Sequence, residues 1–367
     1  MMSPLKFRDL FVERVWGGDG LARFFAKQLP AGRPIGESWE VSAYPGTTSV
    51  VADGPCAGVS LDTLCREFPQ EILGEQLLEQ GIQEFPLLIK FIDARELLSV
   101  QVHPDDAYAR RYDKMPWGKC EMWYILRAEP GARLIYGLAE EVSPEEFLRA
   151  AEEGTIERYL HEVEVCAGNV MVIPPGCVHA LGGGIIICEV QESSDLTYRI
   201  YDWGRVGLDG RPRSLHLDKA LEVIDFSLLR PKKGYSLTVS DQRGDRQYLS
   251  ACQHYAVELI TIKGKWEDTD DRRAFHVLSV VEGSGQVVDS QGSETELRKG
   301  ESLLLPATAG NYRVEADRGV FRIIRAYVPD LVGDIIEPLR RYGFSDDEIV
   351  GLGGEGRRND LAKLLGR

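Results

Sequence analysis

The stretch from Val170 to Trp203 constrains the fold more than any other part of the chain. It reads VMVIPPGCVHALGGGIIICEVQESSDLTYRIYDW. A short apolar run, two prolines and Gly176 precede His179, and three glycines and a second apolar run, Ile185–Val190, follow it. Short apolar runs bounded by Pro and Gly predict buried β-strands joined by a tight turn. A histidine on such a turn suits either a metal ligand at the mouth of a small barrel or the polar cap of a hairpin.

The size and charge of the chain exclude several classes of function. Its 367 residues suffice for about two domains, each with its own core. The net charge of -15 argues against nucleic acid or an anionic membrane as a partner, and an anionic substrate would need a locally basic pocket. No apolar stretch has the length of a membrane helix, and the N-terminal residues lack the apolar core of a signal peptide. The seven cysteines are scattered without a CxxC pair, which favours reduced thiols and therefore a cytoplasmic protein.

The remaining pattern predicts a mainly β protein with peripheral helices. Leucines and isoleucines recur at helical spacing at about 56–82, where Pro69 must divide the helix, and at 143–161, where Ser143 can cap it. A third helical pattern covers 214–226. We therefore expect helices inserted between the strands of a β domain.

The second half of the chain predicts a second, smaller β-barrel. From about Tyr235 short strands alternate with turns, and KGESLLLPAT loosely repeats the earlier AGNVMVIPPG. The repeat lacks a histidine after its proline, Pro306, so we expect a metal in the first barrel alone. The predicted division is a first domain at 1–234, a second, metal-free domain at 235–328 and a tail of two short helices at 329–367.

The tail contains a glycine string that resembles a nucleotide-binding motif. Gly351, Gly353 and Gly356 follow a GxGxxG-like spacing in GLGGEG. No predicted strand precedes them, whereas a dinucleotide site needs one. A flexible glycine linker is the better interpretation.

Four residues form a candidate metal site. In SVQVHPDD, Gln101 and His103 lie two apart and so share one face of a strand. Glu121 follows in GKCEMWYIL, on the same strand face as Lys119, while Cys120 points the other way. With His179 they give a nitrogen and oxygen ligand set that suits zinc or another divalent first-row metal. Separately, each residue has a plain structural alternative, such as a turn cap for His103 or an ion pair with Lys119 for Glu121.

One further charge stands in an apolar run. Lys90 lies within FPLLIKFI, which predicts a buried strand. A buried lysine is costly unless its ammonium reaches a polar cavity or a partner. Lys90 is therefore a candidate for a substrate pocket.

The segments SVQVHPDD, GKCEMWYIL, PPGCVHAL and SSDLTYRIYDW, with PIGESWE upstream, occur in an order that resembles the type I mannose-6-phosphate isomerases. These are zinc-dependent enzymes of the cupin family, and the length resembles their shorter bacterial members. The resemblance covers roughly residues 7–230 well and the second barrel more loosely. It implies a cupin fold, a jelly-roll type of β-barrel, and the activity of an aldose-ketose isomerase.

The resemblance also assigns residues. It implies that Gln101, His103, Glu121 and His179 bind one zinc ion per chain. Arg199 matches an active-site arginine, Asp195 an acidic residue implicated in the chemistry, and Lys119 a lysine associated with the sugar phosphate. Lys90 is a further substrate-binding candidate. The family often has Pro where this chain has Cys120. The resemblance does not extend to the C-terminal tail.

These assignments lead to an expected function with open alternatives. We expect interconversion of mannose 6-phosphate and fructose 6-phosphate by proton transfer through an enediol, in a monomer or weak homodimer without nucleic-acid or membrane partners. The alternatives are another metal cupin, such as an iron oxygenase, and a sugar-binding module without catalysis. For Arg199 the alternative is a strand-end ion pair with Asp195 or Asp202, and the identity of the general base stays open.

Overall fold

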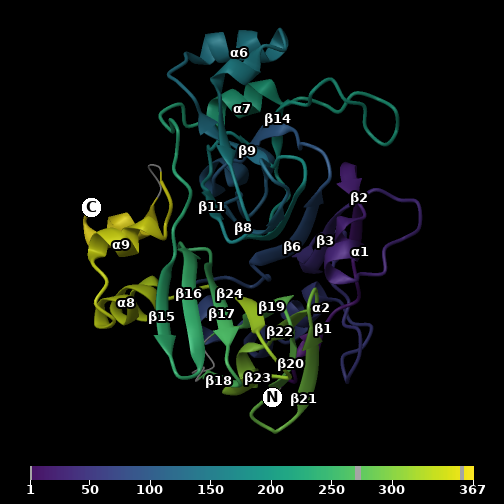
Figure 1. Ribbon diagram of the computed structural model, residues 1–367, viewed down its shortest axis with the longest axis vertical. Helices are drawn as coiled ribbons and strands as arrows, with labels where there is room; N and C mark the ends of the chain where they lie inside the picture. Colours follow the sequence, from purple (N-terminus) through teal and green to yellow (C-terminus); the bar gives the residue numbers. More distant parts are fainter. Residues whose placement is uncertain (1, 269–273, 356–358) are drawn as a thin grey trace.

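The computed structural model describes residues 2–268, 274–355 and 359–367 (Figure 1). Strands dominate it, and every pair of neighbouring strands in its sheets runs antiparallel. Four large sheets form two layered β units, which we call the first and second sandwich. The mainly β fold with peripheral helices is confirmed.

The first sandwich consists of a six-stranded and a five-stranded sheet. The six-stranded sheet has the order β11 (Val170–Ile173), β8 (Glu121–Ala128), β13 (Ile185–Glu192), β6 (Leu87–Ala94), β3 (Ile35–Val41) and β2 (Phe11–Gly18). The five-stranded sheet has the order β10 (Leu160–Glu164), β9 (Arg133–Leu138), β12 (His179–Ala180), β7 (Val100–Val102) and β14 (Tyr198–Tyr201). A small hairpin, β4 (Ala43–Tyr44) with β5 (Thr47–Thr48), lies outside these sheets.

The second sandwich lies below the first in Figure 1. Its seven-stranded sheet has the order β1 (Leu5–Lys6), β22 (Ser302–Leu305), β19 (His276–Glu282), β24 (Phe321–Tyr327), β17 (Ala256–Ile262), β16 (Gly244–Ala251) and β15 (Leu237–Asp241). The four-stranded sheet has the order β18 (Lys265–Asp268), β23 (Tyr312–Ala316), β20 (Ser284–Val288) and β21 (Glu294–Arg298). Strand β1 comes from the start of the chain yet pairs with β22. The boundaries 1–234, 235–328 and 329–367 stay a prediction.

Helices lie at the periphery of both sandwiches. The first half of the chain contains α1 (Gly20–Phe25), α2 (Leu61–Glu67), α3 (Pro69–Ile72), α4 (Glu75–Glu79), α5 (Asp106–Tyr108), the π-helical turn Ala109–Asp113, α6 (Pro144–Glu152) and the 3₁₀ turn Ile156–Tyr159. The second half contains α7 (Leu217–Val223), the 3₁₀ turn Ala307–Ala309, the π-helical turn Leu331–Ile336, α8 (Glu337–Arg341), α9 (Asp346–Gly351) and α10 (Asp360–Leu365). None of the helices in the described part of the chain is long and apolar enough to cross a membrane.

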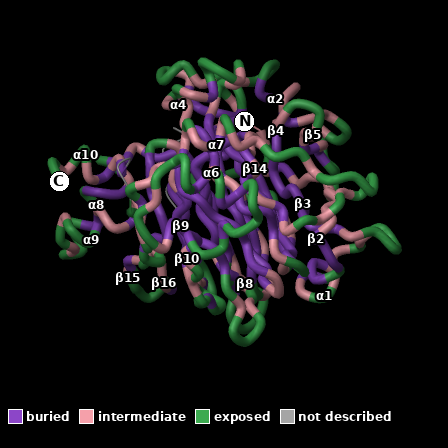
Figure 2. Tube along the Cα trace, turned by 90° about the horizontal axis from the view of Figure 1, so that it is seen from above, coloured by how far each residue is buried: buried purple, intermediate pink, exposed green. Residues whose placement is uncertain are grey.

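The inner strands β6 and β13 of the six-stranded sheet are buried on both faces, which explains their long apolar runs. On β6, Ile89 and Phe91 pack in a cluster with β17, β19 and β24 of the second sandwich. Ile92, on the opposite face, packs with Trp123 inside the first sandwich. Figure 2 shows the resulting buried centre. The second sandwich therefore covers one apolar face of the six-stranded sheet. Because side chains alternate along a strand, every other residue of β6 points instead into the space between the two sheets of the first sandwich.

Two sequence-based expectations about helices need correction, and a third is confirmed. The helix expected at 143–161 is α6 alone, because Gly154 has a φ of +70° and ends it, after which the chain forms a 3₁₀ turn and β10. The helix expected at 214–226 is shorter, Leu217–Val223. The division at Pro69 is confirmed, since this residue is the first of α3.

The tail is more structured than expected. It holds α8, α9 and α10 as well as a π-helical turn, and these pack on β15, β16 and β24. Gly351 is the last residue of α9, and a Cβ placed there would lie 2.2 Å from the Tyr235 ring. Gly351 is therefore a close-packing position, not part of a flexible linker, and Gly356 lies outside the described residues.

Candidate active site

The four predicted metal ligands meet inside the first sandwich. Gln101 lies on β7 and His179 on β12, and the two residues are register partners. Glu121 opens β8, and His103 follows β7 directly. Glu121 Oε1 lies 3.2 Å from His179 Nε2 and 3.6 Å from His103 Nε2, and Gln101 Nε2 lies 3.2 Å from His179 Nε2. His103, Glu121 and His179 are almost completely buried.

The ring nitrogens of both histidines are arranged as in a metal site. His103 Nδ1 donates to the Leu196 carbonyl at 2.8 Å, and His179 Nδ1 donates to the Cys177 carbonyl at 2.9 Å. These bonds direct both Nε2 atoms towards Glu121, which is the usual role of carbonyls around metal-bound histidine. His103 Nε2 and Glu121 Oε1 are buried without a hydrogen-bond partner. Such groups are costly unless an ion is bound, so the donor set fits a metal.

The charge states at this cluster also suit a metal. Burial and the neighbouring Lys119 ammonium lower the pKa of His103 to about 3, so its imidazole is neutral. Burial raises the pKa of Glu121, but the Lys119 ammonium, 2.9 Å from Glu121 Oε2, outweighs it and holds the pKa well below its usual range. Neutral imidazole and ionised carboxylate are the forms that bind metals.

Lys119 lies beside this cluster. Its Nζ is 2.9 Å from Glu121 Oε2, and the charge of Glu121 raises its pKa although burial opposes the charged form. Strand β8 begins only at Glu121, so Lys119 lies just before the strand rather than on it. Both side chains still point into the first sandwich, while Cys120 packs on the opposite side, as predicted.

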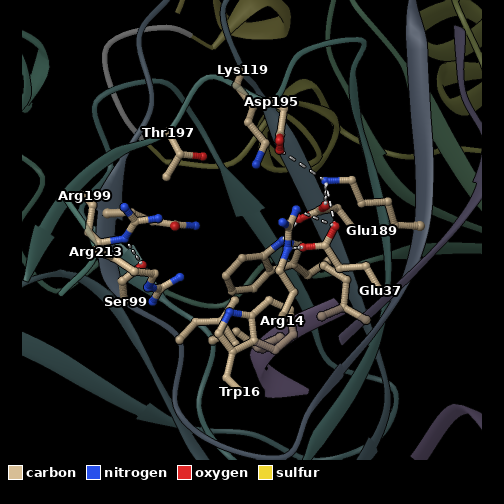
Figure 3. Close-up of a pocket in the computed structure, with 16 residues that line it drawn as sticks. Arg14, Trp16, Glu37, Ser99, Lys119, Glu189, Asp195, Thr197, Arg199 and Arg213 are labelled. Carbon is tan, nitrogen blue, oxygen red and sulfur yellow. Dashed lines mark hydrogen bonds and ion pairs between the residues drawn. The ribbon is translucent and has the colours of Figure 1, made fainter. Parts of the chain in front are cut away.

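A polar cavity of about 240 Å³ adjoins the cluster (Figure 3). Its volume lies below the 300–1,000 Å³ typical of pockets for drug-sized ligands, so it suits a small molecule. Five cationic side chains line it, Arg14, Lys90, Lys119, Arg199 and Arg213, against three carboxylates, Glu37, Glu189 and Asp195. Cations therefore outnumber carboxylates in the lining itself, although Lys119 and Arg213 also pair with carboxylates that do not line the cavity, Glu121 and Asp202.

The buried Lys90 forms the centre of a charged network in this cavity. Its Nζ lies 3.2 Å from Glu189 Oε2 and 3.9 Å from both Glu37 Oε2 and Asp195 Oδ1. The ammonium also lies over the Trp39 ring, 4.9 Å from its centroid. The Lys90 ammonium thus has both a polar cavity and carboxylate partners, and its role in substrate binding stays a prediction.

Asp195 differs from its neighbours in exposure. Its side chain is 36% exposed, whereas that of Glu189 is 3% exposed. It lies in the loop between β13 and β14, on the side of the cavity that also holds Lys119 (Figure 3). Asp195 therefore combines access to a bound molecule with proximity to two ammonium groups.

Arg199 lies on β14 at the other side of the cavity (Figure 3). Its Nε donates to Ser99 Oγ at 3.3 Å, and a terminal nitrogen donates to the Ser214 carbonyl at 2.9 Å. Neither of the acids considered above pairs with it: Asp195 approaches Lys90, and Asp202 binds Arg205 and Arg213. Desolvation and the nearby Arg213 charge lower the pKa of Arg199. Two neighbouring guanidinium groups mark a position for an anion.

Sequence reasoning missed several residues of the cavity. Glu189 was detectable as a charge in the apolar run IIICEVQE, by the argument that identified Lys90, its register partner. Glu37 lies within the quoted segment PIGESWE; burial raises its pKa, but Lys90 and Arg14 lower it to about 2. Arg14 donates to Glu37 Oε1 at 2.8 Å. No sequence signal identified Arg213, because only the fold brings its loop to the cavity.

Comparison with known proteins gives consistent matches along the chain. Residues 5–122 match the model of the phosphomannose isomerase type I catalytic domain. This range of the chain includes three of the predicted ligands, Gln101, His103 and Glu121. Residues 245–328 match the mannose-6-phosphate isomerase cupin domain. The mannose-6-phosphate isomerase of Streptococcus mutans is 35% identical over 319 residues, which cover 86% of this chain and 96% of that protein. The mannose-6-phosphate isomerase ManA of Bacillus subtilis is 35% identical over 321 residues, covering 85% and 96%.

A solved structure agrees with these matches. The crystal structure of a mannose 6-phosphate isomerase from Bacillus subtilis superposes with a TM-score of 0.79 at 32% identity, covering 89% of this chain and 99% of that one. The similarity thus extends over both sandwiches, in fold as well as in sequence. This chain belongs to the type I mannose-6-phosphate isomerase family.

Proposed function

We propose that the protein is a zinc-dependent isomerase that interconverts mannose 6-phosphate and fructose 6-phosphate in the cytoplasm. The observation that carries this proposal is a buried ligand cluster beside a cavity with five cationic and three anionic side chains. In a chain of net charge -15, this local excess of positive charge favours a small anionic substrate. The family supplies the substrate class, since its relatives are named for mannose 6-phosphate.

We propose that His103, Glu121, His179 and Gln101 hold one zinc ion, Gln101 through its amide oxygen, which takes the position of Nε2 when the side-chain amide is turned over. Two imidazoles, a carboxylate and an amide oxygen suit zinc. When bound, zinc supplies Lewis acidity to the oxygens on the reacting carbons. The second sandwich acts in this proposal as a structural partner that covers the apolar face of β6.

Isomerisation moves a proton between C1 and C2 of the sugar. Asp195 is the proposed base that removes the proton from one carbon and returns it to the other, because it is the accessible carboxylate of the cavity. Lys119 and Lys90 line the cavity beside it, and Lys90 Nζ lies 3.9 Å from Asp195 Oδ1. The reaction from mannose to fructose 6-phosphate also moves a hydroxyl proton from O2 to O1. Lys119 lies next to Glu121, where it can donate to the oxyanion of the enediolate while that proton is transferred.

Arg199 is the proposed phosphate-binding residue. It has no carboxylate partner within ion-pair distance among the described residues, and it lies at the side of the cavity opposite Glu189 and Glu37 (Figure 3). A planar guanidinium can donate two parallel hydrogen bonds to a phosphate. This arrangement holds the phosphate at Arg199 and directs C1 and C2 towards Lys119 and Asp195.

A coupled assay that detects fructose 6-phosphate tests the proposal. We expect turnover of mannose 6-phosphate and much weaker turnover of unphosphorylated mannose, because mannose makes no contact with Arg199. Absence of turnover with a metal-loaded, folded protein would contradict the isomerase assignment. Size-exclusion chromatography with light scattering tests the expected monomer or weak homodimer.

A further inference from the structure

A second group of ligand-type side chains lies outside the candidate active site, where the two sandwiches meet. It consists of Asp106 at the start of α5, Glu192 at the end of β13 and His254 in the turn between β16 and β17. Their ligand atoms all lie within 4.8 Å of one another. We propose that these three residues bind a second divalent metal ion, of the transition-metal class that accepts nitrogen and oxygen ligands.

The contact between Glu192 and His254 repeats a feature of the first cluster. Glu192 Oε1 lies 3.0 Å from His254 Nδ1, yet this oxygen is buried and makes no hydrogen bond. Glu121 Oε1 shows the same combination, 3.2 Å from His179 Nε2 without a hydrogen bond. A ring nitrogen and a carboxylate oxygen in close approach without hydrogen-bond geometry are expected of two atoms that share an ion rather than a proton.

The burial of Glu192 strengthens this argument. The residue is 1% exposed, and its other oxygen, Oε2, accepts the backbone N–H of Cys120 at 2.7 Å. A buried carboxylate that lies near a second carboxylate, Asp106, is costly without a compensating charge. No arginine or lysine forms an ion pair with Glu192 among the described residues. A divalent ion would supply the missing positive charge.

Asp106 is already oriented by its neighbours. Its Oδ1 accepts the Gly118 N–H at 2.8 Å, and its Oδ2 accepts from Arg110 at 2.6 Å. Each carboxylate oxygen has two lone pairs, so both oxygens retain one for a metal. Hydrogen bonds of this kind to a ligand carboxylate are usual around metal sites. The Arg110 charge weakens the attraction for a cation, so the structure favours a weaker site than the first.

An ion can reach this group. A cavity of about 730 Å³ is lined by all three residues, together with Asp105 and Asp360, against the cations Arg110 and Lys363. Gln253, next to His254, donates its backbone N–H to Asp360 of α10 at 3.1 Å. An ion bound here would therefore join the first sandwich, the second sandwich and the tail. It raises the expected metal content from one to two ions per chain and adds a ligand, His254, from the region expected to be metal-free.

Equilibrium dialysis against zinc, followed by elemental analysis, tests this proposal. The full-length protein is first stripped with a chelator and then dialysed against excess zinc. We expect about two ions per chain in the parent and about one in His254→Ala and in Glu192→Gln. His161→Ala is the control, because His161 Nδ1 contacts the Tyr136 carbonyl and belongs to neither group; it should keep two ions.

A further variant separates the two sites. His179→Ala should retain the second ion, and His179→Ala combined with His254→Ala should retain none. Thermal unfolding with and without zinc shows which variants are folded, and Glu192→Gln preserves side-chain volume if His254→Ala does not fold. One ion in the parent, or a second ion that persists in both His254→Ala and Glu192→Gln, would overturn the proposal.

Discussion

Replacement of Arg199 by alanine tests whether this residue acts in catalysis or only stabilises the fold. In the free protein the side chain makes two hydrogen bonds, to Ser99 and to the Ser214 carbonyl, and no ion pair with Asp195 or Asp202. At about 1 kcal/mol for each bond, the loss of stability is about 1–2 kcal/mol. That change lowers the melting temperature by a few degrees in a protein of this size.

The expected effect on catalysis is larger. A charged hydrogen-bonding pair with phosphate in a partly buried cavity contributes on the order of 3 kcal/mol, so kcat/KM for mannose 6-phosphate should fall about a hundredfold. Arg199→Lys keeps the charge but loses the planar fork, and it should recover part of the activity. Turnover of unphosphorylated mannose should change little.

The assay measures kcat, KM, metal content and melting temperature for the parent and both variants. Arg133→Ala is a matched control, because Arg133 lies on β9 of the same sheet, forms an exposed ion pair with Glu162 and does not line the cavity. If Arg199→Ala turns over mannose 6-phosphate within a few-fold of the parent, or melts far below it with turnover intact, the assignment of Arg199 to the substrate is wrong.

Three further predictions concern the metal, acid stability and the contact between the sandwiches. His179→Ala should lose one metal ion per chain and the activity together, as elemental analysis and the coupled assay would show; retained activity would contradict the ligand assignment. Burial raises the pKa of Glu258, but Arg246 and Arg325 outweigh it and lower the pKa from 4.5 to about 2. The ionised carboxylate therefore contributes on the order of 3 kcal/mol to stability. This contribution is present above pH 4.5 and is lost as the pH falls towards 2. Denaturant titrations should therefore show a shallower fall in unfolding free energy over that range for Glu258→Gln, and an unchanged slope would refute the prediction. Phe275 packs on Phe85 with ring centroids 4.5 Å apart, so Phe275→Ala should lower stability by about 3–5 kcal/mol, measured by denaturant unfolding; a loss below 1 kcal/mol would contradict a structural role for this contact.

The sequence predicted the residues that lie on short, regular segments. Gln101 and His103 share a strand face by the two-residue period, and the Pro-Gly turn fixes His179, so these positions follow from local geometry. Lys90 was identified because a charge in an apolar strand requires a partner. The structure brings these residues together as expected.

Other residues depend on long-range pairing that the sequence does not specify. Glu189 becomes part of the site because the register of β13 on β6 places it opposite Lys90. Arg213 reaches the cavity through a loop that Asp202 holds. His254 approaches Glu192 only because the sandwiches pack on each other. The helix predicted at 143–161 was too long for a simpler reason. Gly154 takes a left-handed conformation that ends the helix, and apolar periodicity does not detect it.

The central claim is that the buried cluster of Gln101, His103, Glu121 and His179 holds the metal on which isomerisation depends. The most direct measurement is the rate of fructose 6-phosphate formation from mannose 6-phosphate by the parent protein as purified, after chelator treatment and after dialysis back into zinc. We predict activity as purified, at least a hundredfold loss on metal removal with the fold retained, and recovery with zinc. Full activity in metal-free, folded protein would contradict the account.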